Sequence, residues 1–438
     1  MSSRGHLGPG GHTPAVTAGF ALAMLASLLL VGCDTDHMKL NTAPLKSDTE
    51  TAEIAPADSL EFQISGDEAI ATELGGPLAG LTAEELKRFA EGKDEFEEEE
   101  TVEEGLGPVF NEASCKTCHD APVGGTSGRG ETRFGRWDQG RFNPLAHRGG
   151  SLIQDKAIGH VVTPNGEYTF VPEVVPREAN VSATRITTPL FGLGLVDAVS
   201  DAVLLELARR QARNTPSTRG TAHVVTEAGT GETRVGRFGW KAQVSTLREF
   251  SADAYLNEMG ITSPLFPNEN APQGNLAALA YNPLPTMNDA GEGVVAFFDF
   301  MTLLGPPPRG RRTDQTDAGG KIFREIGCAN CHTPTLMTGE SPVAALNRKS
   351  FQPFSDFLLH DMGSLGDGIV QGRAGARQIR TAPLWGLRSR PVFLHDGRAS
   401  TPQAAILAHD GQGSAARERF TRLGFRDRLA LFAYLRIL

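Results

Sequence analysis

Three things are missing from this sequence, and each absence excludes a class of protein. Beyond Cys33, every cysteine stands in one of two C-x-x-C pairs, so a structural zinc site has no further ligand pair to draw on. No basic patch accompanies the net charge of −10, which argues against nucleic acid as a partner. The longest apolar run, residues 18–30, is too short for a comfortable membrane span. What remains is the composition of a soluble globular protein, long enough for two to three domains.

Two segments of the chain share one pattern, residues 107–119 and residues 320–332. In each, a Gly stands three residues before a Phe, and the Phe stands five residues before the first Cys of a C-x-x-C-H. This motif is typical of covalent haem c attachment, in which two thiols form thioethers to the vinyl groups and the following imidazole becomes the proximal iron ligand. We therefore predict two covalently bound haem c groups, one on Cys115, Cys118 and His119 and the other on Cys328, Cys331 and His332.

Two other interpretations of the cysteine pairs fit the sequence less well. A thioredoxin-like redox pair would need a βαβ context, which neither copy shows. Two small disulfides, Cys115–Cys118 and Cys328–Cys331, would make the protein a haem-free binding lipoprotein, but only if both C-x-x-C-H matches are accidents.

The N-terminal segment has the shape of a secretory signal. A basic residue, Arg4, precedes the apolar run, and the sequence Leu30-Val31-Gly32-Cys33 resembles a bacterial lipobox. We expect a lipoprotein signal peptide over residues 1–32, a lipidated Cys33, and a flexible tether over residues 33–80. Because haem c is attached outside the cytoplasm, both signals place the protein on the periplasmic side of the envelope. The choice between inner and outer membrane stays open.

Further echoes divide the remaining chain into two halves. Residues 187–193, which begin T-x-P-L, match residues 381–387, and the apolar residues 295–304 parallel residues 429–438. A helix is expected after Thr82, with Glu85 completing its cap, whereas residues 120–180 read as loops. The expected fold is mainly α, with two cytochrome c-type haem domains: residues 81–305, carrying a loop-rich insertion at about 198–288, a linker over 306–317, and residues 318–438.

These motifs together resemble a known family. The two halves, the T-x-P-L loops, and residues 105–111, 237–242, 358–363 and 393–398 are similar to the di-haem oxidoreductase family, related to bacterial di-haem cytochrome c peroxidases. The resemblance covers most of residues 100–438. It implies a peroxidase-type oxidoreductase in which the first haem reacts with peroxide and the second takes electrons from a small redox carrier or a quinol-linked donor. The rival interpretation is a non-catalytic di-haem electron carrier.

The resemblance also implies axial ligands. In the peroxidases a Met ligand follows the histidine of the H-D-G stretch by fourteen residues, and here that spacing from His395 leads to His409. This departure predicts bis-histidine coordination of the second haem by His332 and His409, with Met362 as the alternative ligand. For the first haem, His147 is a candidate for a displaceable distal ligand.

Distal acid/base residues are less well marked. The relatives use a Gln and a Glu, but the corresponding positions here are Glu206 and Pro216, so the pair is not reproduced. Glu173 is a second candidate for a distal carboxylate. A Trp between the haems has possible substitutes in Trp240 and Trp385, and a calcium ion between the domains, usual in relatives, has Asn143 as a candidate ligand.

Overall fold

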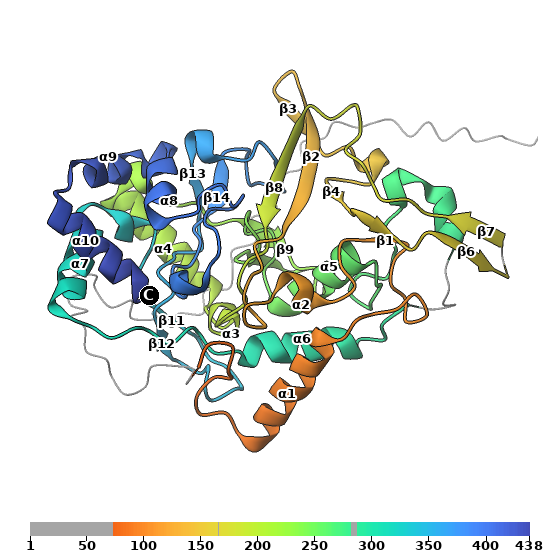
Figure 1. Ribbon diagram of the computed structural model, residues 1–438, viewed down its shortest axis with the longest axis horizontal. Helices are drawn as coiled ribbons and strands as arrows, with labels where there is room; N and C mark the ends of the chain where they lie inside the picture. The colour runs from red at the N-terminus through yellow and green to blue at the C-terminus, as the bar shows by residue number, and fades with distance from the viewer. Residues whose placement is uncertain (1–72, 165, 282–286) are drawn as a thin grey trace, which may run out of the picture. The chain divides into compact units, whose positions relative to one another are not determined.

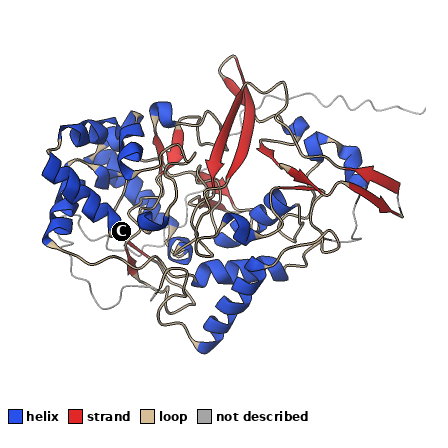
Figure 2. Ribbon diagram, in the orientation of Figure 1, coloured by secondary structure: helices blue, strands red, loops and turns tan. Residues whose placement is uncertain are grey.

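The computed structural model describes residues 73–164, 166–281 and 287–438. Cys33, the expected signal peptide and most of the expected tether lie outside these residues. Among the described helices, none combines the length and the apolar character that crossing a membrane would need. The helices (Figures 1 and 2) are α1 Ala83–Glu97, α2 Cys115–Cys118, α3 Leu193–Asp197, α4 Asp201–Asn214, α5 Leu247–Met259, α6 Glu292–Leu303, α7 Asp314–Glu325, α8 Pro402–Ala408, α9 Ser414–Arg422 and α10 Phe425–Arg436.

The strands are short and pair antiparallel in small sheets. They are β1 Val109–Phe110, β2 Gly130–Asp138, β3 Arg141–Asn143, β4 Leu152–Ile153, β5 Lys156–Ala157, β6 His160–Thr163, β7 Gly166–Thr169, β8 Val181–Ile186, β9 Val224–Thr226, β10 Thr233–Val235, β11 Leu336–Met337, β12 Ser350–Phe351, β13 Leu359–Asp361 and β14 Gln378–Arg380.

Each half is closed by a pair of packed helices, α1 with α6 and α7 with α10. The helix expected after Thr82 is confirmed, because Thr82 and Glu85 form a complete capping box at the start of α1. The T-x-P-L loop meets the last turn in the same way in both halves: the amide of Gly192 donates to Leu304 O, and that of Gly386 donates to Leu438 O. The echoes seen in the sequence therefore correspond to the same local structure twice.

The predicted match between residues 107–110 and residues 320–323 is wrong. Gly320 and Phe323 lie in α7, but their expected partners, Gly107 and Phe110, lie before and within the strand β1. The glycine where α1 crosses α6 is Gly92, where a Cβ would lie 2.3 Å from Ala296 O; its counterpart where α7 crosses α10 is Gly319, where a Cβ would lie 2.0 Å from Ala430 O.

A phenylalanine follows each crossing glycine by four residues. The ring of Phe96 packs on Phe300 at 4.9 Å between centroids, and Phe323 packs on Tyr434 at 5.6 Å. In the first half, residues 98–114 separate α1 from the haem motif. In the second half, only residues 324–327 lie between Phe323 and Cys328. The match of residues 107–110 to 320–323 is therefore a coincidence of spacing.

The close crossing at Gly319 gives a stability prediction. Gly319→Ala should lower the free energy of unfolding by about 1–3 kcal/mol, because its methyl group would overlap the backbone of α10. This loss opposes helix propensity, which favours Ala by about 1 kcal/mol. Urea unfolding of the haem-loaded full chain measures it, with Gly375→Ala as the control, since a Cβ there meets nothing closer than 3.5 Å. Equal midpoints for the two variants would show that the crossing tolerates a side chain.

The expectation of loops over residues 120–180 is wrong. The long strand β2 pairs with β8 from Gly130 opposite Ile186 to Gly135 opposite Val181, and it also pairs with β3 and β4. Glycine, proline and arginine obscured the strand because the pairing joins segments about fifty residues apart, a relation that local propensity does not reveal.

The expected boundaries also shift in detail. The end of the expected tether is part of the fold, since Leu78 is buried and its amide donates to Leu303 O. The helix α7 begins at Asp314, inside the expected linker, with Thr313 as its cap. The expected insertion is not only loops, because it contains α4 and α5. The largest apolar cluster of the described residues draws on both halves, including Leu336, Phe357 and Trp385 from the second.

Candidate functional site

The first C-x-x-C-H forms the short helix α2, with His119 as its C-terminal cap. The Nδ1 atom of His119 lies 3.4 Å from the carbonyl oxygen of Gly125. Because a carbonyl only accepts, Nδ1 carries the hydrogen and Nε2 keeps its lone pair. Burial lowers the pKa of His119 to about 4. The imidazole is thus neutral and oriented in the way that histidine ligands of metals usually are.

A cavity with about 1220 Å³ of empty space opens around this motif. Its walls come from α2, from β2 and β8, from α5 and from α6, so residues far apart in sequence meet there. Cys115, Cys118 and His119 lie on one wall. The cavity is mostly apolar and has two thiols and a neutral imidazole on its wall, a set of groups that fits a covalently attached haem.

The cavity is also lined by a group of half-buried charged side chains that sequence reasoning missed. Glu131 on β2 receives Arg133 Nε at 2.7 Å and Nη2 at 2.9 Å, a bidentate pair. Glu258, at the end of α5, accepts from Asn111 Nδ2 at 2.6 Å. Glu131, Arg133, Asp253 and Glu258 all line the cavity.

These carboxyl groups have shifted pKa values. Burial raises the pKa of Glu258 to about 8, and the neighbouring Glu131 charge adds to the shift. Burial alone would raise the pKa of Glu131, but the charge of Arg133 and its hydrogen bonds outweigh burial and lower it. Burial also raises the pKa of Asp253 to about 6. At neutral pH, therefore, Glu258 carries a proton that it donates to the Glu131 carboxylate.

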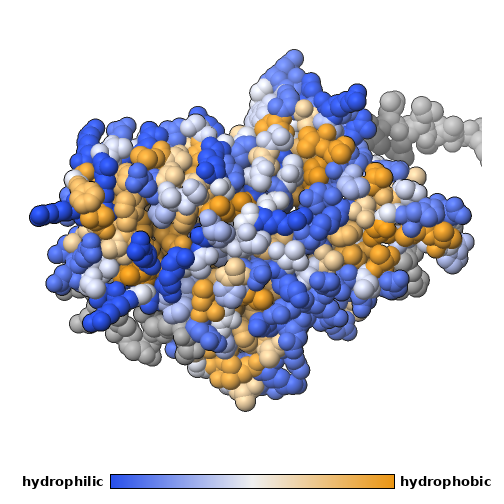
Figure 3. Space-filling model, viewed as in Figure 1, coloured by the Kyte–Doolittle hydropathy of each residue, from blue (hydrophilic) through white to orange (hydrophobic). Residues whose placement is uncertain are grey.

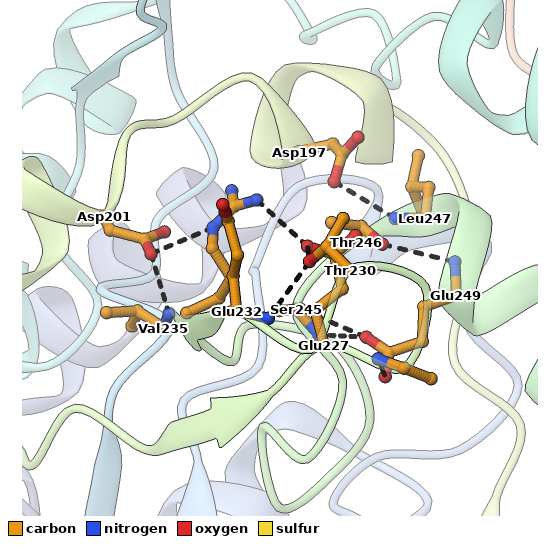
Figure 4. Close-up of polar contacts among 12 residues, drawn as sticks. Asp197, Asp201, Glu227, Thr230, Glu232, Val235, Ser245, Thr246, Leu247 and Glu249 are labelled. Atoms are coloured by element: carbon orange, nitrogen blue, oxygen red, sulfur yellow. Dashed lines mark hydrogen bonds and ion pairs between the residues drawn. The ribbon is translucent and has the colours of Figure 1, made fainter.

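The helix that carries Glu258 is fixed at its other end by a polar cluster (Figure 4). Thr246 caps α5 by accepting from the Glu249 amide, and Asp197 accepts from the Leu247 amide at 3.1 Å. The side chain of Glu249 in turn accepts from Ser245 Oγ at 3.1 Å. Nearby, Asp201 accepts from the Val235 amide at 2.9 Å. These bonds tie the inserted segment to α3 and α4 and so aim α5 into the cavity.

The second C-x-x-C-H places His332 opposite His409. Each imidazole has its Nδ1 against a backbone carbonyl, His332 at 3.0 Å from Phe354 O and His409 at 2.7 Å from Ala405 O, so each Nε2 keeps its lone pair. The two ring centroids are 6.4 Å apart. Two imidazoles on opposite sides of one metal, with bonds of about 2.0–2.1 Å, have centres about 6.3 Å apart. The pair therefore fits two axial ligands of one iron.

His409 owes its position to α8. Thr401 caps this helix by accepting from the Ala404 amide, Pro402 starts it, and His409 follows its last residue. The carbonyl of His409 accepts from Arg417 at 2.7 Å. Met362 lies close by, because a Cβ on Gly413 would lie 3.2 Å from His409 Cδ2 and 3.4 Å from Met362 Cε. The structure thus brings both candidate ligands to the same turn.

Cys115, Cys118 and Cys328 carry thiols that are poor nucleophiles. Burial raises the pKa of Cys115 and of Cys328 to about 12, and that of Cys118 to about 11. Since thiolate is the reactive form, such cysteines do not fit a redox-active dithiol. The four cysteines also form no disulfide with one another, so the structure does not support the disulfide interpretation.

Two arginines, the buried Arg380 and the half-buried Arg390, give a second test of whether the residues fit haem. Arg380 donates to the carbonyls of Gly239 and Thr381, and Arg390 donates to those of Pro383 and Trp385. Burial lowers the pKa of each to about 10, and Arg390 Nε is buried with no partner. Both line a cavity with about 410 Å³ of empty space between the two T-x-P-L loops. Such guanidinium groups fit the carboxylates of a haem propionate.

Most of the other predicted site residues lie elsewhere. Glu206 is on the surface of α4, paired with Arg209 and Arg213, and is not among the residues that line the first cavity. Glu173 is buried, but its carboxylate accepts from the backbone amides of Gln154 and Gln273 and lies outside that lining. The structure therefore places neither candidate where a distal carboxylate is needed.

The remaining ligand candidates are also accounted for by local structure. His147 is exposed in a short turn after β3 and is not among the residues that line the first cavity. The side-chain carbonyl of Asn143 accepts from the Leu145 amide at 2.8 Å. In the described residues, no group of three or more His, Cys, Asp or Glu side chains could hold a metal ion, and calcium stays a prediction.

The two candidate tryptophans, Trp240 and Trp385, lie in different surroundings. Trp240 lines both the first cavity and the smaller one, donates from Nε1 to Ile186 O at 2.8 Å, and lies 6.1 Å from the His395 ring. Trp385 is buried in the main apolar cluster against Phe351. Trp240 is therefore the one that faces the candidate cofactor space.

A sequence signal for the missed carboxylates does exist. In α5, Phe250 and Asp253 are three residues apart, so an acid shares a helix face with an aromatic ring. An ionisable group with a strongly shifted pKa in a cleft is a candidate for a functional site.

Comparison with known proteins agrees with the motifs. Residues 174–438 match the family described as "Di-haem oxidoreductase, putative peroxidase". This is more than half of the chain, and the chain belongs to that family; membership implies haem cofactors. The match includes the second C-x-x-C-H and begins after the first. No protein of curated function matches the chain.

Several solved structures are similar at low identity. The hydrazine synthase of Kuenenia stuttgartiensis is 14% identical, covers 88% of this chain and 98% of its own, and has a TM-score of 0.38. A MauG-like protein associated with microbial copper homeostasis is 14% identical over 88% and 95%, with a TM-score of 0.33. The diheme peroxidase BthA from Burkholderia thailandensis is 15% identical over 85% and 92%, with a TM-score of 0.35.

Proposed function

We propose that this protein is a di-haem c-type oxidoreductase of peroxidase type. In this proposal Cys115, Cys118 and His119 hold the haem at which peroxide reacts, and Cys328, Cys331, His332 and His409 hold the haem that receives electrons. The observation that carries the proposal is the proton-bearing pair Glu258 and Glu131 in the cavity of the first site. The second site instead presents His409 to His332.

The residues of the first site can handle the protons of peroxide reduction. Hydrogen peroxide, two protons and two electrons yield two water molecules. When bound, the two haems would supply the electrons and an open coordination position. The Glu131 carboxylate, kept ionised by Arg133, can accept a proton from peroxide, and Glu258 can give its own proton to the departing oxygen, which leaves as water. The proton on Glu131 can then pass to Glu258 through the hydrogen bond that joins them, which restores both groups, and the two protons consumed in each turnover come from solvent. Asn111 holds the Glu258 carboxyl in place.

In this proposal His332 and His409 would both bind the second haem iron and leave no position for peroxide. Each of the two imidazoles is held by a backbone carbonyl, which fixes the ring orientation. A bis-histidine site stabilises ferric iron better than a His/Met site does, so we expect a low potential. Trp240, between the cavities, is the aromatic group best placed to assist electron transfer inward.

The remaining parts of the proposal come from the sequence. A lipid on Cys33 would anchor the protein to a membrane on the periplasmic side, as the lipobox-like pattern and the haem c motifs both favour. The electron donor would be a small redox carrier or a quinol-linked protein, and peroxide or another small molecule would be the substrate.

Peroxide turnover tests the proposal directly. We expect the haem-loaded protein, supplied with a small artificial electron donor, to consume hydrogen peroxide with two donor electrons per peroxide. Donor oxidation at a rate no greater than that of the C115A/C118A variant, which lacks the first attachment site, would contradict it. That result would favour the electron carrier that the sequence left as an alternative.

A further inference from the structure

The last two helices, α9 and α10, carry an excess of positive charge. Residues 414–438 contain six arginines and two acidic residues, although the whole chain has a net charge of −10. The net charge of the whole chain conceals this local excess. The acidic residues instead gather in α1 and the segment after it, where residues 83–104 hold eleven acids and three bases.

This basic segment contacts the second C-x-x-C-H site at two places: the turn that carries His409 and the residues just before Cys328. Arg417, near the start of α9, donates to the carbonyl of the candidate ligand His409 at 2.7 Å. Arg419, two residues on, donates to Ile326 O at 3.2 Å, just ahead of Cys328. A single helix thus joins the segment that carries one candidate axial ligand to the loop that carries the haem attachment motif.

Exposed apolar side chains lie among these arginines. Phe425 is 78% exposed and Leu429 is 45% exposed, and they are four residues apart on one face of α10. Arg422 and Arg426, next to them in the chain, are exposed as well. Figure 3 shows apolar surface bordered by hydrophilic side chains in the region of α8, α9 and α10. An apolar centre with arginine around it is typical of a protein–protein interface.

We propose that this surface, made by Arg419, Arg422, Phe425, Arg426 and Leu429, is the docking site for a small acidic electron-transfer protein. The proposal rests on the proposed function, in which the second haem receives the electrons. Each docking event would oxidise the partner by one electron and reduce the second haem by one.

Charge decides the kind of partner. An acidic protein is attracted to this surface and repelled by the rest of the chain, which is acidic, so it arrives oriented toward the second site. A basic carrier would be drawn instead to the acidic segment around α1. Because exposed charges act over about 8–10 Å at physiological ionic strength, such steering acts on the association rate and weakens as salt is added.

The test compares two donors on the haem-loaded full chain by stopped-flow reduction of the second haem. The donors are a reduced acidic cupredoxin and a reduced basic cytochrome c of similar size. With wild type at low salt, we expect the acidic donor to react about tenfold faster or more, with a rate that falls as salt rises. The double variant R422E/R426E should reverse this preference. The control R141E/R177E changes the charge equally at exposed arginines of the first half and should keep it.

Each outcome decides the matter. If R422E/R426E keeps the wild-type preference, or if the control reverses it, this surface is not the docking site. The spectra of both haems show whether the double variant has folded, and the milder variant F425S replaces it if it has not. If anionic phospholipid vesicles bind wild type and not R422E/R426E while donor preference is unchanged, the surface serves a membrane and the proposal fails. Failure of peroxide turnover with the artificial donor would overturn the proposed function but not this preference.

Discussion

Glu258→Gln is expected to lower kcat for peroxide reduction by about 10²–10⁴-fold, the usual contribution of a positioned acid/base group. The amide keeps the size of the carboxyl group and can still accept from Asn111, but it has no proton to give. The loss should therefore appear without a change in haem content or in the unfolding midpoint.

The pH profile gives this prediction a second readout. Because burial raises the pKa of Glu258 to about 8, the proton is present below that pH and lost as the pH rises through it. Wild-type kcat/KM should thus fall above about pH 8, and the residual activity of E258Q should lack this limb.

Glu206→Gln is the matched control, since Glu206 is a surface carboxylate on α4 outside the cavity. We expect its activity to equal that of wild type. Full activity of E258Q together with a large loss in E206Q would place the acid/base group where the sequence first indicated and not in this cavity.

His409→Met is expected to raise the reduction potential of the second haem by on the order of 100 mV, because a thioether stabilises ferric iron less well than an imidazole does. Spectroelectrochemistry of the loaded protein measures the potential, and low-temperature EPR should show the bis-histidine signal of wild type replaced by that of a His/Met site.

Met362→Leu separates the two candidate ligands. Met362 lies beside the same turn, so a ligand exchange would affect it as well. We expect M362L to keep the wild-type potential and EPR signal. An unchanged potential in H409M with a shifted one in M362L would assign the ligand to Met362 and contradict the geometry of the His332–His409 pair.

The features that the sequence could predict are those that depend on residues close together in the chain. The C-x-x-C-H motifs, the capping box at Thr82 and the helices that close each half depend on residues a few positions apart, and the family follows from motifs in a fixed order. The spacing from His395 to His409 led to a histidine that the structure does place opposite His332.

What it could not predict depends on distant contacts. The pairing of β2 with β8 and the meeting of Glu131 with Glu258 join segments far apart in the chain, and no local pattern encodes either contact. The misaligned repeat at Gly107 and Phe110 shows the opposite error. There a local spacing matched by accident, while the true counterparts Gly92 and Phe96 were separated from their haem motif by extra residues.

Low-temperature EPR of the oxidised, haem-loaded protein, before and after half-reduction and with and without cyanide, tests the central claim most directly. We expect two haems that differ: one low-spin signal from the bis-histidine second site that cyanide leaves unchanged, and one signal from the first site that cyanide alters. Two low-spin signals that cyanide leaves unchanged in both redox states would show that both irons are closed, and the peroxidase assignment would be wrong.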